Sequence, residues 1–203
     1  MKVFLILMIV AMAVSSIGFR KYVWFISIGY GFAISAIGIA LIAMFHGSMD
    51  IGLLIQCVLF IVYGCRLGGY LAYRELRSGS YNKKMKNEIK DGKGMSLIAK
   101  CSIWISAALL YVCETSPVMF RLINGKGTDG CVAAGIIIMI CGLVLETTAD
   151  LQKNAAKRSN PGRFVDTGLY RIVRCPNYFG EMTFWTGVFI SGIGSNAGVW
   201  QWI

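Results

Sequence analysis

The chain has 203 residues, of which 56% are hydrophobic and only 15% are charged, and its formal net charge is +10. So few charges argue against an ordinary water-soluble globule, and the basic residues alternate with long apolar runs instead of forming one nucleic-acid-binding patch. We therefore expect an integral, multi-pass membrane protein that binds no nucleic acid and forms one membrane-embedded domain over residues 1–203.

Six apolar runs are candidates for helices that cross the bilayer. They cover residues 3–18, 23–45, 51–73, 97–119, 130–148 and 178–203. A transmembrane helix needs about 20 predominantly apolar residues. The sequence therefore predicts an all-α, multi-pass transmembrane helix bundle of about six spans.

The first and last runs each leave an alternative open. Lys2 and the small residues of the first run also suit a signal peptide, although Arg20 and Lys21 after the run favour a span. The last run reaches Ile203 without a polar tail. Either it ends at the far membrane surface, or a further C-terminal helix follows.

The basic residues predict the orientation of the spans. Sixteen of the 20 Lys and Arg residues lie in or beside the connections after the first, third and fifth runs, and only Lys2, Arg121 and Lys126 lie on the other side. Cytosolic loops of membrane proteins carry the excess of Lys and Arg. We expect the N-terminus outside and the large basic loops in the cytosol.

The seven cysteines and the single histidine predict no metal site and no disulfide framework. No two cysteines form a CxxC pair, and only Cys175 lies in a polar loop. We interpret His46 as a solvated residue in a turn. The segment GKGTDG at 125–130 fits GxGxxG, but it follows a membrane span and not a strand, so we interpret it as a loop.

Polar residues inside the apolar runs are the candidate site. Tyr63, Arg66 and Tyr70 are spaced i, i+3 and i+7, so they share one helix face. An arginine within a span needs a carboxylate or a water-filled cavity. We expect either an ion pair with a glutamate (Glu114, Glu146 or Glu181) or recognition of a phosphate or carbonyl.

Acidic residues recur at helical spacing in the second half of the chain. Glu146 and Asp150 are spaced i, i+4. The repulsion between two like charges at this spacing is modest, and it is offset when each carboxylate accepts a hydrogen bond from a donor. Asn177 and Glu181 are also i, i+4 and follow Pro176, which suits the start of a helix. These residues either cap or solvate helix ends or line a polar cavity.

Three segments and one pair together resemble a known family. Residues 145–152 (LETTADLQ), 168–171 (GLYR) and 174–181 (RCPNYFGE) look like the C-terminal signature of the steroid 5-alpha-reductase family, in particular its small bacterial-type branch of multi-pass membrane reductases. Tyr63 and Arg66 are similar to the family's Tyr-x-x-Arg. The resemblance covers roughly residues 51–185.

The resemblance implies an NADPH-dependent membrane reductase. Such enzymes saturate a carbon–carbon double bond conjugated to a carbonyl in a lipid-like substrate, with the cofactor entering from the cytosol and the substrate from membrane lipid. Tyr63 would hydrogen-bond the substrate carbonyl, and Glu114 is the candidate for its carboxylate partner, since the first two spans hold no acidic residue. The residues that would bind the cofactor are Arg66, Glu146, Asp150, Arg171, Arg174, Asn177, Tyr178 and Glu181.

Two other functions fit parts of the same pattern. Gly168, Tyr170 and the segment 174–178 partly match the loop of S-adenosylmethionine-dependent membrane methyltransferases of the isoprenylcysteine or phospholipid type, which have a histidine where this chain has Cys175. The second alternative is a non-catalytic sterol- or lipid-binding membrane protein. The substrate and the oligomeric state stay open.

Overall fold

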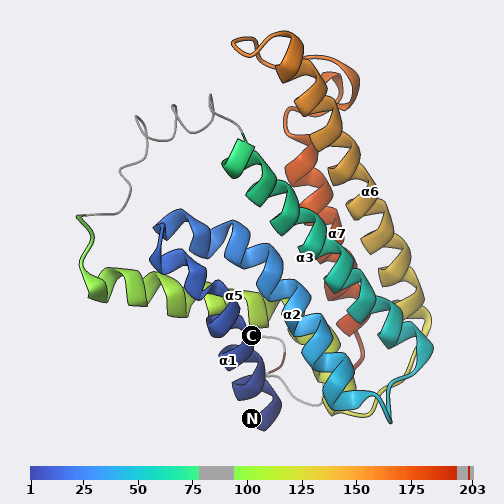
Figure 1. Ribbon diagram of the computed structural model, residues 1–203. Helices are drawn as coiled ribbons and strands as arrows, with labels where there is room; N and C mark the ends of the chain where they lie inside the picture. Colours follow the sequence, from blue (N-terminus) through green and yellow to red (C-terminus); the bar gives the residue numbers. More distant parts are fainter. Residues whose placement is uncertain (78–93, 196–200, 202–203) are drawn as a thin grey trace.

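The computed structural model describes residues 1–77, 94–195 and 201, and these residues form helices and connections without a β-strand. The all-α bundle predicted from the sequence is therefore confirmed (Figure 1). In chain order, the α-helices are α1 (Lys2–Ser15), α2 (Ile28–Phe45), α3 (Ile51–Arg77), α5 (Leu97–Ile123), α6 (Gly130–Ser159) and α7 (Pro176–Gly192). Short 3-10 turns lie between them: η1 (Ser16–Phe19), η2 (Tyr22–Ile26) and η3 (Gly168–Arg171).

Five helical segments of the described chain are long and apolar enough to cross a membrane. They are Lys2–Phe19, Tyr22–Phe45, Ile51–Glu75, Leu97–Ile123 and Gly130–Ser159. Large apolar side chains such as Ile9, Ile137 and Met182 are exposed on their outer faces and on α7. This exterior suits a hydrocarbon environment, as expected of an integral membrane protein.

The sixth predicted span is shorter than the sequence suggested. The run at 178–203 is helical only to Gly192, because Ile193 is extended (φ −60°, ψ 133°) and Gly194 has a φ of +75°, a left-handed conformation that favours glycine. α7 thus has 17 residues, at the lower limit for crossing a bilayer. Residues 196–200 and 202–203 of the predicted span lie outside the described residues.

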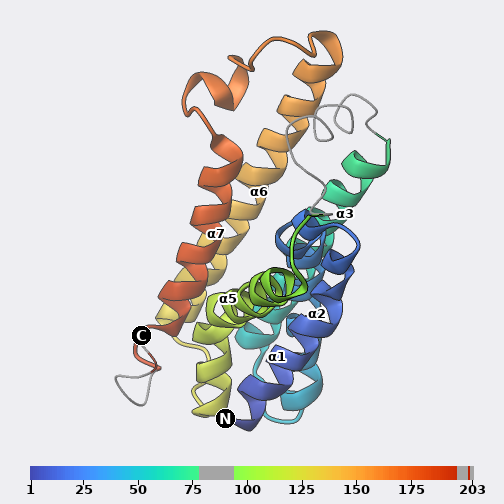
Figure 2. The same ribbon diagram turned by 90° about the vertical axis from the view of Figure 1, so that its left-hand side faces the viewer.

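Two pairs of neighbouring helices form the frame of the bundle. α2 runs beside α3, and α6 runs beside α7, as both views of the ribbon show (Figures 1 and 2). Glycines bring the backbones together. A Cβ on Gly31 of α2 would lie 2.8 Å from the carbonyl oxygen of Gly64 in α3, and one on Gly142 of α6 would lie 2.4 Å from the backbone nitrogen of Phe184 in α7. Small residues of this kind allow close helix packing in membranes.

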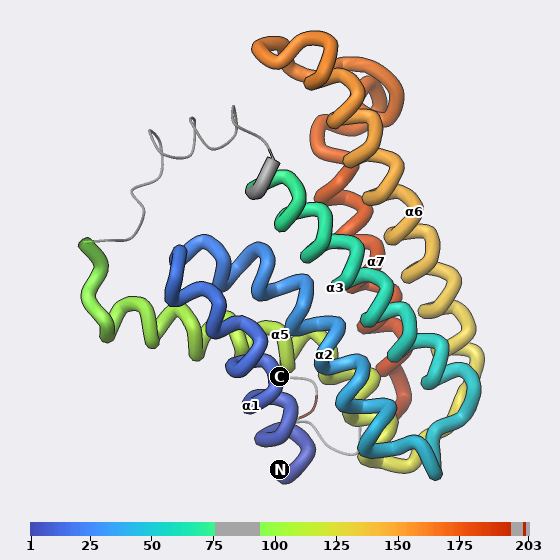
Figure 3. The backbone as a smooth tube through the Cα atoms, in the orientation of Figure 1, coloured from blue at the N-terminus to red at the C-terminus, as the bar shows by residue number. Residues whose placement is uncertain are grey.

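Helix α5 crosses the other helices and bends along its length (Figures 2 and 3). Pro117 lies inside it. Proline has no backbone N–H, so it removes the hydrogen bond to the carbonyl four residues earlier and kinks a helix. The bent second half packs against α7, where a Cβ on Gly192 would lie 2.6 Å from the Pro117 side chain.

The connections alternate between the two ends of the bundle. Lys21, after α1, pairs with Glu75 near the end of α3, whereas Asp50, before α3, accepts a hydrogen bond from the backbone of Thr128, before α6. The α6–α7 connection lies at the end of α6 opposite to Thr128 (Figure 1). This alternation is the one that the sequence predicts. The sequence predicts a basic connection at 74–93, but α3 continues to Arg77. Residues 78–93 lie outside the described residues.

Candidate functional site

A buried ion cluster joins α3 to α6. Arg66 of α3 lies 2.5 Å from a carboxylate oxygen of Glu146 (Nη1 to Oε1), and its other terminal nitrogen pairs with Asp150. The i, i+4 spacing of the two acidic residues places both on the face of α6 that meets α3. The arginine therefore satisfies its need for a carboxylate, and the two like charges share one cation.

The cluster continues along α3 toward the loop between α6 and α7. The Tyr70 hydroxyl donates to Oδ1 of Asn154 at 3.0 Å, and the guanidinium of Arg74 lies 5.6 Å from the centre of the Tyr70 ring. Tyr63, Arg66 and Tyr70 thus lie on one face of α3, as their spacing predicts. Glu146 keeps one carboxylate oxygen, Oε2, buried without a hydrogen-bond partner among the described residues.

Deeper in the bundle, two tyrosines meet one carboxylate. Tyr63 of α3 and Tyr30 of α2 each donate to Oε1 of Glu181 in α7, at 3.2 Å in both cases. The two hydroxyl oxygens are 3.3 Å apart, and Nε1 of Trp185 donates to the Tyr30 hydroxyl at 2.9 Å. Three helices thereby hold a group of four hydrogen-bonding side chains in an otherwise apolar interior.

Packing fixes the position of this group. The Tyr63 ring is fully buried and stacks on Phe184 with ring centres 4.3 Å apart. Close approach of α6 and α7 adds to this, because a Cβ on Gly180 would lie 2.6 Å from the backbone nitrogen of Glu146. The glycine before Glu181 therefore brings that carboxylate close to the ion cluster.

Glu114 of α5 lies at the edge of the same group. It is near enough to Tyr30, Tyr111 and Glu181 to interact with them electrostatically, and its Oε2 is buried without a hydrogen-bond partner among the described residues. The carboxylate that accepts from Tyr63, however, is Glu181, which the family resemblance assigns to the cofactor.

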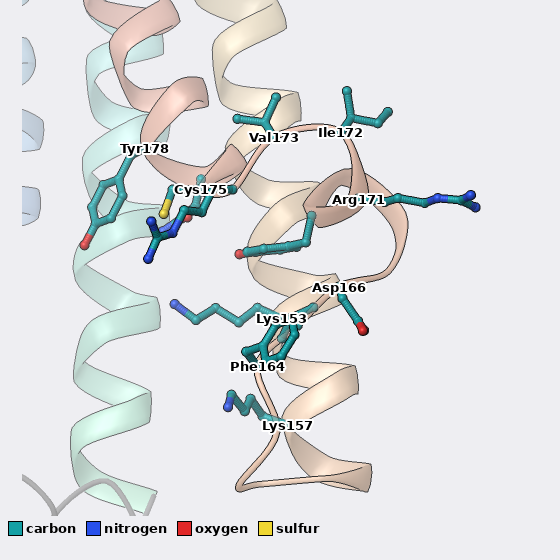
Figure 4. Close-up of a pocket in the computed structure, with 13 residues that line it drawn as sticks. Lys153, Lys157, Phe164, Asp166, Arg171, Ile172, Val173, Cys175 and Tyr178 are labelled. Atoms are coloured by element: carbon teal, nitrogen blue, oxygen red, sulfur yellow. The ribbon is translucent and has the colours of Figure 1, made fainter.

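A pocket opens between the end of α6 and the loop that leads into α7. Its volume is about 670 Å³, within the usual range for ligand sites. Lys153 and Lys157 of α6, with Arg171 and Arg174 of the loop, give it a basic lining, and Phe164 adds an aromatic face. Figure 4 shows the two lysines extending from α6, whereas the Arg171 side chain points away from them.

The loop around this pocket is held by hydrogen bonds to α6. The backbone N–H of Leu169 donates to Oε1 of Gln152 at 2.8 Å. Nζ of Lys157 donates to the carbonyl oxygens of Pro161 and Arg163, at 3.2 and 2.5 Å. Lys157 therefore shapes the loop, while Lys153 has no such structural bond among those of the described residues.

Tyr170 connects the pocket to the ion cluster. It lines the pocket, and its hydroxyl is buried without a hydrogen-bond partner among the described residues. Burial raises the pKa of Tyr170 to about 12, and the charge of Asp150 contributes to the same shift. The phenol therefore stays neutral and able to donate at physiological pH.

The predicted site residues thus fall into two adjoining groups. Tyr63, Arg66, Glu146, Asp150, Glu181 and the neighbouring Glu114 lie in the interior, whereas Arg171, Arg174, Asn177 and Tyr178 line the loop pocket. Tyr30 belongs to the interior group but was not predicted from the sequence. The available signal was a lone tyrosine within the apolar run at 23–45.

A second residue that sequence reasoning passed over lies at the opposite end of the bundle. The guanidinium of Arg121 is buried and donates to the carbonyl oxygens of Gly127 and Ser191, at 2.7 and 2.8 Å, and to Asp129 at 3.0 Å. Asp129 also accepts from the first backbone N–H groups of α6. Although burial opposes it, these hydrogen bonds lower the pKa of Asp129. This cluster holds α7 to α5, and the segment at 125–130 is part of that connection.

Comparison with known proteins agrees with the family resemblance. A family described as "Protein of unknown function (DUF1295)" matches residues 11–203. Steroid 5-alpha-reductase DET2 of Arabidopsis thaliana is 36% identical over 55 residues, which cover 26% of this chain and 21% of the reductase. Steroid 5-alpha-reductase DET2 of Gossypium hirsutum is 31% identical over 72 residues, covering 34% and 25% of the two chains.

The chain therefore matches about a quarter or less of the length of these two reductases. No solved structure gives a significant match. The expected similarity to the steroid 5-alpha-reductase family is confirmed by the family match and the two relatives.

Proposed function

Because the chain belongs to the DUF1295 family and is similar to steroid 5-alpha-reductases, we propose that it is a membrane-embedded, NADPH-dependent reductase. It reduces a carbon–carbon double bond conjugated to a carbonyl in a lipid-like substrate. The observation that best supports this proposal is a series of interacting polar groups between the basic pocket and Tyr63. It passes from Tyr170 through Asp150, Arg66, Glu146 and Glu181.

The basic pocket fits the phosphate end of the cofactor. Phosphate groups bind Arg and Lys through charge-assisted hydrogen bonds. Lys153 and Arg174 supply such donors, and Arg171 would join them only after its side chain turns toward the lysines. Tyr170 and Tyr178 offer aromatic faces for an adenine ring. The buried Oε2 of Glu146 and the Tyr170 hydroxyl lack partners in the described chain, so they fit ribose hydroxyl or amide groups.

The interior group fits the reacting end. When bound, NADPH would supply a hydride for the β-carbon of the enone, which would convert the carbon–carbon π bond into a negative charge on the carbonyl oxygen. The Tyr63 hydroxyl stabilises that charge as an oxyanion-hole donor does. Transfer of the Tyr63 proton to that oxygen would give the enol. The enol becomes the saturated carbonyl product when a proton from water adds to the α-carbon and the hydroxyl proton returns to the tyrosine. Arg66, Asn177 and Glu181 hold the cofactor in register with Tyr63, and Glu114 is the further acidic side chain at this end.

The orientation that we propose for the protein in the membrane is based on the positions of the basic loops. The pocket between Lys153 and Tyr178 faces the cytosol, the N-terminus lies outside, and the substrate reaches Tyr63 from membrane lipid. The full span of residues 1–203 acts as one reductase-like domain.

Ligand-dependent stability tests this function. The purified protein in detergent is heated with NADPH, NADH or S-adenosylmethionine, and the melting temperature is measured. A ligand present at a hundred times its dissociation constant stabilises a protein by about 2.7 kcal/mol. We expect stabilisation by NADPH. Stabilisation by S-adenosylmethionine alone would instead identify a methyltransferase, and no shift with any ligand would indicate a non-catalytic lipid-binding protein.

A further inference from the structure

Two hydroxyl groups donate to the same carboxylate oxygen in the interior group. Tyr30 and Tyr63 both donate to Oε1 of Glu181 at 3.2 Å, from helices that are separated in the chain by the turn at 46–50. A phenol carries a single proton. While Tyr63 donates to Glu181, it has no proton to offer to a substrate carbonyl.

Tyr63 therefore has to release Glu181 before it can serve the reaction proposed above. A carboxylate in a partly apolar interior is destabilised when a donor leaves it, because few water molecules replace that donor. The release is easy only if a second donor stays on Glu181. The structure supplies one donor of this kind, the Tyr30 hydroxyl.

Trp185 fixes the direction of the Tyr30 proton. The indole N–H can only donate, and it points to the Tyr30 oxygen at 2.9 Å. The Tyr30 proton must then point elsewhere, and the acceptors in reach are Glu181, Glu114 and the Tyr63 oxygen, of which Glu181 accepts at 3.2 Å. The Tyr30 ring is held in place against Tyr111, with ring centres 5.1 Å apart.

We propose that Tyr30 is a positioning residue for the reduction: oriented by Trp185, it stays hydrogen-bonded to Glu181 and so frees the Tyr63 hydroxyl to turn to the substrate carbonyl. This inference rests on the proposed function. It assigns a positioning role to Tyr30 and to Trp185, neither of which touches the reacting atoms. Tyr63 alone donates to the substrate.

The test compares Tyr30→Phe with the matched variant Tyr111→Phe in the full-length protein in detergent. Tyr111 is a neighbouring buried tyrosine whose hydroxyl donates to the backbone oxygen of Phe25, away from Glu181. NADPH oxidation is measured with three enone probes: progesterone, a long-chain 2-enal and a polyprenal. The Michaelis constant for NADPH, the melting temperature and the solvent deuterium isotope effect on kcat are measured beside it.

We expect Tyr30→Phe to lower kcat roughly tenfold or more, within the range for groups that assist proton transfer. The Michaelis constant for NADPH and the melting temperature should stay near the wild-type values. The solvent isotope effect should decrease, because a slow release of Tyr63 precedes the proton transfer and masks its isotope effect. Tyr111→Phe should leave kcat unchanged. A Tyr30→Phe protein with wild-type kcat overturns the role of Tyr30 while leaving the proposed function intact.

A second variant guards against a folding defect in Tyr30→Phe. Trp185→Phe keeps both tyrosine hydroxyls and removes the N–H that orients Tyr30, so kcat should fall by a smaller factor, with the isotope effect again decreased. Unchanged kcat and isotope effect in this variant count against the orienting role. A wild-type protein that binds no NADPH, or reduces none of the three probes, overturns the proposed function itself and the role of Tyr30 with it.

Discussion

Gly180 of α7 lies directly against Glu146 of α6. A Cβ at position 180 would come within 2.6 Å of the Glu146 backbone nitrogen, closer than real Cβ atoms approach. This contact brings the backbones of α6 and α7 together at Glu146 and Glu181. The candidate site therefore depends on the absence of a side chain at position 180.

The variant Gly180→Ala should therefore lower the free energy of unfolding by about 1–3 kcal/mol, as overpacking does in well-packed interiors. The change is measured as the melting temperature in detergent. Gly69→Ala in α3 is the matched control, because nothing lies within 4 Å of its Cβ position and alanine favours a helix. If both variants melt alike, the contact at Gly180 does not limit stability.

Removal of the Tyr63 hydroxyl should separate binding from chemistry. For Tyr63→Phe we expect a dissociation constant for NADPH close to that of the wild type and a kcat about a hundredfold lower, the loss typical of one oxyanion donor. Isothermal titration and NADPH oxidation measure the two quantities. Equal losses of binding and of kcat would assign Tyr63 to the cofactor instead of the substrate.

Loss of Arg66 should leave two carboxylates without their cation. Arg66→Leu should destabilise the protein by about 3–5 kcal/mol, the usual effect of removing one partner from a buried ion pair. The neutral triple variant Arg66→Leu, Glu146→Gln, Asp150→Asn should recover most of that stability, although it should bind NADPH poorly. Stability is measured as the melting temperature of each variant. If Arg66→Leu is as stable as the wild type, the three charged side chains do not depend on one another for stability.

The positive charges that line the basic pocket should contribute to NADPH binding. Lys153→Gln should weaken NADPH binding about tenfold, as expected when a charge-assisted hydrogen bond to a phosphate is lost. The effect should shrink at high salt, because screening weakens the remaining electrostatic attraction. Lys126→Gln, which changes an exposed lysine at the opposite end of the bundle, should bind NADPH as the wild type does. Equal weakening by both changes would indicate a general effect of net charge.

Much of the architecture follows from the order of residues alone. The apolar runs predict the helices, and the i, i+3, i+4 and i+7 spacings predict which polar residues share a helix face, because the helical repeat is a local property. The need of Arg66 for a carboxylate, and of Glu146 and Asp150 for a donor, also follows from the cost of isolated charges in an apolar environment.

Which helix faces pack against one another could be learned only from the folded structure. Nothing local in the run at 23–45 shows that Tyr30 meets Tyr63 and Glu181, since that meeting depends on how α2, α3 and α7 pack. The end of α7 at Gly192 depends on Arg121, whose guanidinium binds the carbonyl oxygens of Ser191 and Ile193. The sequence by itself therefore determined the helices and their polar faces. Only the tertiary structure decided which faces meet, because close backbone contacts at glycines such as Gly142 and Gly180 set the relative positions of the helices.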